Sequence, residues 1–220
     1  MITLSDVYKS FNDGMKTVDV LKGINLDISA GEMVALMGKS GSGKSTLINI
    51  IGGLISPTSG SVSIDGNVTD YTDSNSLFKL RREKIGFILQ DFALINRKTV
   101  LDNITFAVRA KEYKEHRFKR VKELLCEVGL EEKICEYPFN LSNGEKQRVA
   151  IVRALVDNKK IILADEPTGS LDEYNSSLII DIIRKRVTEA KTTALIVTHD
   201  MDVAKKCDRI LHIDYGKIAE

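Results

Sequence analysis

The stretch "GKSGSGKST", residues 38–46, combines glycines with a lysine and a serine. It matches the pattern G-x-x-x-x-G-K-[ST] through Gly38, Gly43, Lys44 and Ser45. Glycine permits backbone conformations in which several N–H groups converge on one anion. A lysine ammonium can reach the outer phosphate oxygens of a nucleoside triphosphate, and a serine hydroxyl can hold Mg²⁺. These residues therefore predict a site for a nucleotide and its magnesium ion.

The context of this stretch supports the prediction. The apolar run at 33–38 is typical of a buried strand, and residues 46–54 have apolar side chains at helical spacing. A helix that starts directly after the loop would point the positive end of its dipole at the bound anion. We therefore expect Ser40, Gly41 and Thr46 to contact phosphate as well.

Two adjacent carboxylates, Asp165 and Glu166, directly follow the apolar run at 161–164. In an open parallel sheet, ligands bind beyond the carboxyl ends of the strands. Asp165 would then support Mg²⁺, and Glu166 would orient or deprotonate a water molecule. By themselves two acids could also form a solvated turn, but a phosphate loop in the same chain favours the functional interpretation.

A third stretch, "LSNGEKQRVAIVRAL" at 141–155, opens with polar residues and continues as a predicted helix. Ser142 and Glu145 have the spacing of a capping box, in which each side chain bonds a free backbone N–H at the helix start. The same helix start could also bind an anion. Both interpretations are open from the residues alone.

These residues need a scaffold of alternating strands and helices. Alternation or short apolar runs predict strands at 20–28, 33–38, 61–66, 85–89, 161–164 and 193–199, helices at 46–54 and 173–187, and a final hairpin at 209–218. Residues 91–157 are mostly helical in pattern. Within them, one predicted apolar stripe comprises Phe118, Val121, Leu124, Leu125 and Val128, with Gly129 as the stop. The pattern predicts an α/β core with a parallel sheet.

Composition narrows the function classes. The 220 residues are long enough for one sizeable core, and 43% hydrophobic with 29% charged residues is typical of a globular protein. A net charge of +1 gives no global attraction to nucleic acid. The three cysteines form no CxxC pair, which speaks against a metal knuckle. The N-terminus is unlike a signal peptide, and no apolar run is long enough to span a bilayer.

Taken together, these motifs resemble those of the ATP-binding cassette (ABC) ATPases. "LSNGE" is similar to the LSGGQ signature of that family, and the order along the chain also agrees: phosphate loop, Gln90 after a strand, signature, "LADEPTGSLD", then His199 after "LIVT". The resemblance covers essentially the whole chain. It implies an α/β fold with a P-loop NTPase (RecA-like) core at 1–90 and 158–220, including an N-terminal antiparallel β subdomain. A helical signature subdomain would be inserted at 91–157, within a single domain.

The resemblance also implies roles for further residues. Phe11, or alternatively Tyr8, would stack on adenine, and Gln90 would sense Mg²⁺ and the attacking water. His199 would contact the γ-phosphate and Asp172 would make a contact in a dimer. Together with Lys44 and Glu166, Gln90 and His199 form the expected catalytic set, and Ser45, Gln90 and Asp165 form the expected metal set.

In this family two cassettes pair head to tail, so the signature residues Ser142, Gly144 and Glu145 would meet the ATP held by the other copy. The chain most resembles the group of lipoprotein-release, macrolide-export and antimicrobial-peptide-resistance ATPases. We therefore expect an ATPase at the cytoplasmic face of a membrane, bound to a separate transmembrane permease that docks near 90–109. No nucleic-acid partner is expected.

Two residues depart from the family signature. Asn143 replaces the first glycine of LSGGQ and Glu145 replaces its glutamine. Asparagine tolerates a left-handed backbone better than other non-glycine residues, so the geometry can survive. The alternatives are a cell-division or other mechanotransmission ATPase, a nucleic-acid-acting ABC ATPase, and a small-molecule kinase with a phosphate loop. The last leaves the signature unexplained, and the nucleic-acid enzymes usually carry coiled-coil insertions or two cassettes in one chain.

Overall fold

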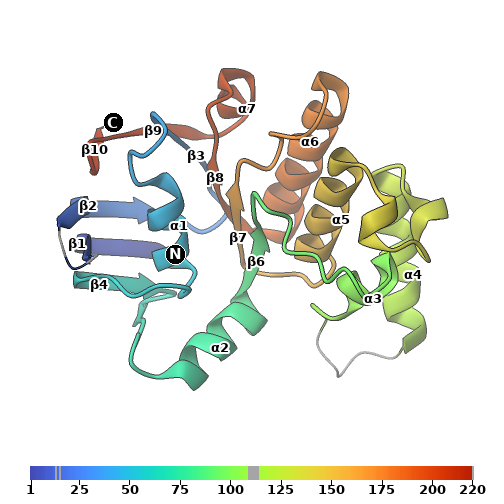
Figure 1. Ribbon diagram of the computed structural model, residues 1–220, viewed down its shortest axis with the longest axis horizontal. Helices are drawn as coiled ribbons and strands as arrows, with labels where there is room; N and C mark the ends of the chain where they lie inside the picture. The colour runs from blue at the N-terminus through green and yellow to red at the C-terminus, as the bar shows by residue number, and fades with distance from the viewer. Residues whose placement is uncertain (13, 15, 109–113, 220) are drawn as a thin grey trace.

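The computed structural model describes residues 1–12, 14, 16–108 and 114–219, and within them two β-sheets (Figure 1). The first is antiparallel with the order β2-β1-β4-β5, and the second has the order β10-β9-β3-β8-β7-β6. In the second sheet β9, β3, β8, β7 and β6 are parallel, and β10 pairs antiparallel with β9. The strands are β1 Ile2–Asn12, β2 Thr17–Ile28, β3 Met33–Met37, β4 Ser59–Ile64, β5 Asn67–Val68, β6 Ile85–Ile88, β7 Ile161–Asp165, β8 Thr193–Val197, β9 Arg209–Asp214 and β10 Lys217–Ala219.

Helices cover both faces of the parallel sheet. Helix α1 lies between the two sheets, whereas α5 and α6 lie on the opposite face, with α3 and α4 beyond them (Figure 1). The bounds are α1 Lys44–Ile51, α2 Ser74–Lys84, α3 Val100–Thr105, α4 Lys114–Glu127, α5 Asn143–Leu155, α6 Glu173–Ala190 and α7 Met201–Lys205, with short 3-10 turns at Glu131–Lys133 and Pro138–Asn140.

The two faces of the parallel sheet form separate hydrophobic cores because successive side chains of a strand point to opposite sides. In β8, Leu195 and Val197 pack with α1 and the antiparallel sheet, while Ala194 and Ile196 pack with α3–α6. Each of the strands β3, β7 and β8 has five residues, all of them buried, as expected for the centre of a parallel sheet. This rigid centre carries the loops that hold the predicted site.

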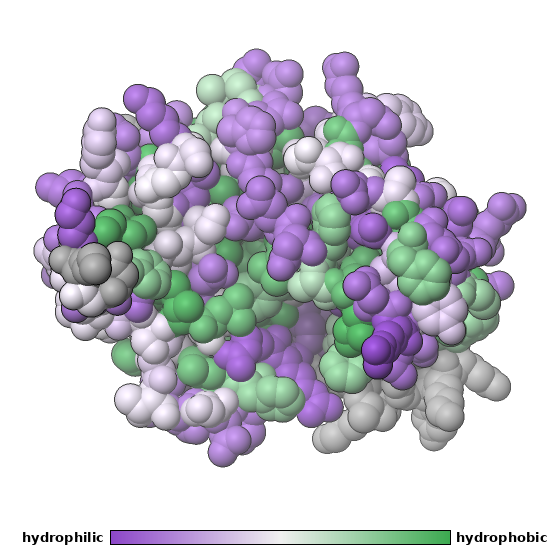
Figure 2. Space-filling model, viewed as in Figure 1, coloured by the Kyte–Doolittle hydropathy of each residue, from purple (hydrophilic) through white to green (hydrophobic). Residues whose placement is uncertain are grey.

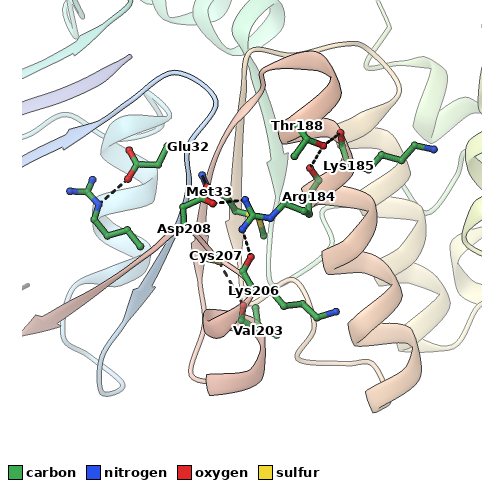
Figure 3. Close-up of polar contacts among 10 residues, drawn as sticks. Glu32, Met33, Arg184, Lys185, Thr188, Val203, Lys206, Cys207 and Asp208 are labelled. Atoms are coloured by element: carbon green, nitrogen blue, oxygen red, sulfur yellow. Dashed lines mark hydrogen bonds and ion pairs between the residues drawn. The ribbon is translucent and has the colours of Figure 1, made fainter.

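A polar tie fixes the start of β3, the strand that leads into the phosphate loop. Figure 3 shows Asp208, which accepts a hydrogen bond from the Met33 N–H at 2.8 Å and an ion pair from Arg184 at 2.7 Å. Arg184 also donates to the Lys206 carbonyl at 2.5 Å. Partial burial by itself would raise the pKa of Asp208, but the Met33 amide and the Arg184 guanidinium outweigh burial and lower this pKa. Helix α6 is thereby joined to the amino-terminal end of β3, a central strand of the sheet.

The predicted strands are all present, and four details of the helices differ from the sequence-based expectation. Helix α1 spans 44–51 instead of 46–54, because it starts inside the phosphate loop and ends at Gly52; Leu54 is exposed. Phe118 is 42% exposed and contacts Lys122, so it lies outside the buried stripe of α4, whose other predicted members are buried. Residues 91–99 form no helix. Helices α2 and α7 were not predicted.

Candidate functional site

Most of the predicted site residues meet at the carboxyl ends of β3, β6, β7 and β8. There a cavity of about 690 Å³ opens between the phosphate loop and the loops after β6, β7 and β8. A crevice at this edge is where parallel α/β sheets bind ligands. Its lining comprises Val20, Gly38, Ser40, Gly41, Gly43, Lys44, Ser45, Thr46, Gln90, Gln147, Asp165, Glu166, Gly169, Ser170 and His199.

The phosphate loop has the geometry of an anion cradle. Gly41 and Gly43 have φ values of 79° and 108°, which side-chain-bearing residues rarely adopt. A Cβ on Gly43 would lie 2.8 Å from Leu21, whereas one on Gly41 would meet no atom within 4 Å. Among the described residues, no side chain caps the N-terminus of α1. Its first N–H groups are therefore available to an anion in the cavity.

Lys44 folds back over this loop. Its ammonium donates to the carbonyl oxygens of Gly38 at 2.7 Å and Lys39 at 2.9 Å. Both bonds hold the charge within the loop, where phosphate oxygens can replace the carbonyl acceptors. The lysine thus supplies a positive charge to an anion bound by the backbone amides.

Asp165 ends β7 as a buried carboxylate, 8% exposed, that lies beside the Ser45 hydroxyl. Burial raises the pKa of Asp165. The Ser45 hydroxyl opposes this shift, Glu166 adds to it, and Lys44 opposes it. A buried acid beside a hydroxyl is a pair of hard oxygen donors, the kind that Mg²⁺ prefers. Ser45 and Asp165, two of the three predicted metal-binding residues, thus lie side by side in the cavity, and the third, Gln90, lines the same cavity.

Glu166 and His199 form the second pair of the site. The Nδ1 atom of His199 lies 2.9 Å from a carboxylate oxygen of Glu166. Glu166 has a φ of 50°, and its N–H donates to the Val197 carbonyl at 3.0 Å. A non-glycine residue in the left-handed region is uncommon and is often held so at a functional site. Glu166 is thereby turned out of the strand and into the cavity.

The signature helix α5 starts with the predicted capping box. The Ser142 hydroxyl accepts from the Glu145 N–H at 3.3 Å, and the Glu145 carboxylate accepts from the Ser142 N–H at 2.8 Å. The backbone and hydroxyl of Ser142 lower the pKa of Glu145, against partial burial. Asn143 is the first residue of the helix and has no positive φ, so this position needs no glycine.

Several predicted residues lie outside the cavity lining. Ser142, Gly144 and Glu145 belong to the start of α5, and Asp172 caps α6 by accepting from the Asn175 N–H at 2.8 Å. Phe11 is 45% exposed, with the Lys9 ammonium 4.9 Å from its ring centroid, and Tyr8 is likewise 45% exposed. Their roles in contacting a second copy or adenine stay predictions.

Four residues of the lining were not predicted: Val20, Gln147, Gly169 and Ser170. Gln147 had a recognisable signal, because it precedes Ile151 and Ala154 at helical spacing and therefore shares their buried face. A glutamine at such a position is either satisfied in the core or aimed at a site. Val20, Gly169 and Ser170 have no local signal of this kind.

Fold and site together define a P-loop NTPase. A family model described as "ABC transporter" matches residues 21–169, more than half of the chain. The chain belongs to this family, which confirms the predicted family and fold class.

Similar proteins agree with this assignment. The chain is 44% identical to the uncharacterized ABC transporter ATP-binding protein MJ0796 of Methanocaldococcus jannaschii, over 99% of this chain and 95% of that protein. It is 43% identical to the macrolide export ATP-binding/permease protein MacB of Escherichia coli, over 99% of this chain but only 34% of MacB. A solved structure described as the dimeric structure of MJ0796 has a TM-score of 0.95 and 43% identity, covering 100% of this chain and 97% of the other. A second MJ0796 structure is a dimeric post-hydrolysis state bound to ADP and Pi.

Proposed function

We propose that this chain is the ATP-hydrolysing subunit of a membrane transport complex of the kind that exports a substrate or extracts it from the bilayer. The single observation that carries the proposal is that the phosphate loop and the acidic strand end, with Ser45 and Asp165, line one cavity beside the Glu166–His199 pair. Family membership and the ADP- and Pi-bound relative support ATP as the nucleotide.

Magnesium fits the donors of this site. Ser45, Asp165 and Gln90 offer a hydroxyl, a carboxylate and an amide oxygen around one cavity. Mg²⁺ is commonly bound through one or two protein oxygens and the phosphates of the substrate. When bound, the ion would neutralise charge on the β- and γ-phosphates.

The remaining residues would perform the hydrolysis. The amides of the loop and the Lys44 ammonium would hold the phosphates. Glu166 would orient a water molecule and accept its proton as the water oxygen attacks the γ-phosphorus and ADP leaves. His199, which is bonded to Glu166 in the structure, would position this carboxylate and contact the γ-phosphate. The products are ADP, inorganic phosphate and a proton.

A head-to-tail dimer would complete the site. Ser142 and Gly144, at the N-terminus of α5, do not line the cavity of their own chain and would instead meet the ATP of a second copy. The dimeric MJ0796 structures support such pairing. Hydrolysis would remove the shared γ-phosphate contact and let the two copies separate, so the dimer would act as an ATP-gated clamp.

The partner would be a permease. The proposal is supported by the relative MacB, which is described as an ATP-binding/permease protein. No helix of the described residues has the length and apolar character needed to cross a bilayer. A groove of about 610 Å³ between α2, β6, α3 and α5 supports the predicted docking near 90–109. Figure 2 shows this side of the molecule hollowed between α2 and α3. At the groove, Phe78 and Phe106 are 54% and 82% exposed.

The charge of the groove indicates what would dock there. Arg81, Arg82, Arg153 and Lys159 line it, and none of its lining residues is acidic. Lys159 is buried and paired with Asp157 at 2.8 Å, so the exposed cation at the rim is Arg82. An apolar floor with a basic rim suits a segment that combines apolar and acidic side chains. We place the chain at the cytoplasmic face of the membrane, held by such a segment.

The proposed activity is tested by replacing Lys44. The Lys44→Ala variant should lose ATP binding and Mg-dependent ATP hydrolysis, measured by nucleotide titration and phosphate release. Lys185→Ala, which removes an exposed lysine of α6, is the matched control and should behave as the unchanged protein. Undiminished ATP affinity in Lys44→Ala would refute the assignment of the phosphate loop.

A further inference from the structure

Gln147 is a buried amide in the wall of the nucleotide cavity. Its side chain is 1% exposed, and it lines the cavity together with Glu166, Gly169 and Ser170. The Nε2 atom is inaccessible to solvent and finds no hydrogen-bond acceptor in the part of the chain that the structure describes. A buried N–H without an acceptor is unfavourable, and such groups are rare in folded proteins. This donor therefore needs an explanation.

The amide lies where α5 packs against the loop that carries the proposed catalytic base. A Cβ added to Gly144 would come within 3.2 Å of the Ser170 carbonyl oxygen, which shows how closely the helix and the loop approach. The loop is a tight turn in which the Gly169 N–H donates to the Glu166 carbonyl at 3.2 Å. Any movement of this turn relative to α5 carries Glu166 with it.

We propose that Gln147 is a positioning residue for ATP hydrolysis: its amide donates to an acceptor on the 166–170 loop when the cavity is filled, and so fixes Glu166. This inference rests on the proposed function. In the structure this donor has no hydrogen-bond partner among the described residues. Filling the cavity would press the loop toward α5 and allow the bond to form.

The position of Gln147 along α5 gives the bond a second effect. Ser142 caps the same helix five residues earlier and would contact the ATP of the other copy. The helix between them is rigid, because its start is fixed by a capping box and its inner face is buried. A bond from Gln147 to the loop would therefore link the filling of one site to the placement of the signature that completes the other.

Two variants remove the donor in different ways. Gln147→Leu has similar volume and no polar atoms, and Gln147→Glu keeps the shape but replaces the NH₂ group by a carboxylate oxygen. Because the Nε2 donor is unpaired in the structure, Gln147→Leu should melt at the same temperature as the unchanged protein or higher. Its ATP affinity should stay within about twofold, its kcat should fall about tenfold or more, and its Hill coefficient for ATP should fall toward 1. The exposed amide variant Asn158→Leu is the control and should change none of these.

Gln147→Glu adds a measurement, the pH dependence of kcat, that would not change if Gln147 had only a structural role. A buried glutamate is protonated more readily, and the protonated carboxyl can again donate a hydrogen bond. The kcat of Gln147→Glu relative to that of Gln147→Leu should therefore rise as the pH falls from 8.5 to about 6. The other ionisable groups that line the cavity, Lys44, Asp165, Glu166 and His199, are the same in both variants.

The outcomes separate this inference from the function beneath it. If the unchanged protein does not hydrolyse Mg-ATP, the proposed function fails. If it does, and Gln147→Leu keeps its kcat and Hill coefficient, only the role of Gln147 is refuted. A parallel loss of ATP affinity and kcat, or identical pH profiles for the two variants, also refutes it. If Gln147→Leu does not fold, the kcat of Gln147→Glu is compared with that of the unchanged protein. A ratio that rises as the pH falls supports the role of Gln147, and a constant ratio refutes it.

Discussion

His199 and Glu166 are joined by a 2.9 Å contact between Nδ1 of the imidazole and a carboxylate oxygen, although 33 positions separate them in sequence. The contact connects the ends of β8 and β7, two neighbouring parallel strands. The histidine side chain is 75% exposed and the glutamate side chain 17% exposed. The carboxylate is therefore held from one side and faces the cavity with the other, as a base that activates water must.

Replacing this carboxylate should separate ATP binding from ATP hydrolysis. Glu166→Gln keeps the shape of the side chain but cannot accept the proton of water, so hydrolysis should slow by about two orders of magnitude or more. Intact ATP would then hold the two copies together, and sizing chromatography with Mg-ATP should show a dimer. Glu189→Gln, at an exposed position of α6, should hydrolyse normally. A Glu166→Gln protein that stays monomeric at saturating Mg-ATP would contradict the clamp.

Asn143 should not impair the signature. It is the first residue of α5 and has right-handed helical backbone, so the glycine of the family signature would bring no conformational relief here. Asn143→Gly should leave the ATPase rate unchanged and lower stability by at most about 1 kcal/mol, since glycine is a poor helix former. Thermal melts and phosphate release measure both effects. A marked gain in rate would mean that asparagine limits the activity after all.

The chemical groups of the site could be predicted from the sequence because each depends on a short local pattern. The phosphate loop and the acids after β7 lie at the ends of buried strands, and the strand pattern places them at one edge of the sheet. The capping box of Ser142 and Glu145 is likewise a local signal and is present as predicted.

Features that depend on packing could not be predicted. Helix α2 has no buried residue and therefore no apolar stripe, so hydrophobic periodicity misses it. The groove unites residues from Phe78 to Lys159, which come together only in the folded chain. The division into a core at 1–90 and 158–220 and a subdomain at 91–157 stays a prediction.

Asp165 should make the free protein less stable as the pH rises. Burial raises the pKa of this carboxyl above its ordinary value of 3.8, with Glu166 acting in the same direction against Ser45 and Lys44. A raised folded pKa means that stability is fully present below the unfolded pKa and is lost as the pH rises through the folded one. Asp165→Asn should therefore be more stable than the unchanged protein at pH 7.5 without nucleotide, and this difference should narrow toward pH 4.

The same variant should gain less from its ligand. Asparagine lacks the charge that would hold Mg²⁺, so Mg-ATP should raise the melting temperature of Asp165→Asn much less than that of the unchanged protein. Urea unfolding at several pH values, with and without Mg-ATP, measures both effects. An Asp165→Asn protein that is less stable at pH 7.5 without ligand would show that the buried charge is well compensated.

Arg153 should hold the segment that follows Gln90. Its guanidinium donates to the carbonyl oxygens of Phe92, at 2.7 Å, and Ala93, two consecutive residues with φ values of 62° and 46°. Arg153→Met would leave these carbonyls unpaired and should cost about 1–3 kcal/mol. Hydrogen exchange of 91–95 should speed up while the amides of α6 stay protected. Arg153→Lys keeps a cation with fewer donors, so the exchange rate of 91–95 in this variant should lie between those of the other two proteins. Equal exchange rates in all three proteins would show that other contacts hold the segment.

The basic rim of the groove should decide which membrane protein binds. Arg82 is exposed there, with its guanidinium 5.8 Å from the ring centroid of Phe78. Arg82→Glu reverses the charge and should reduce capture of a permease from detergent-solubilised membranes about tenfold or more, because acidic side chains of the docking segment would be repelled. ATP hydrolysis by the isolated chain should not change, since Arg82 does not line the nucleotide cavity. Lys119→Glu, at a side chain of α4 that is 78% exposed, reverses a charge outside the groove and is the control. Equal capture by both variants would place the docking site elsewhere, and recovery of only nucleic acid or of proteins without membrane spans would argue against a permease partner.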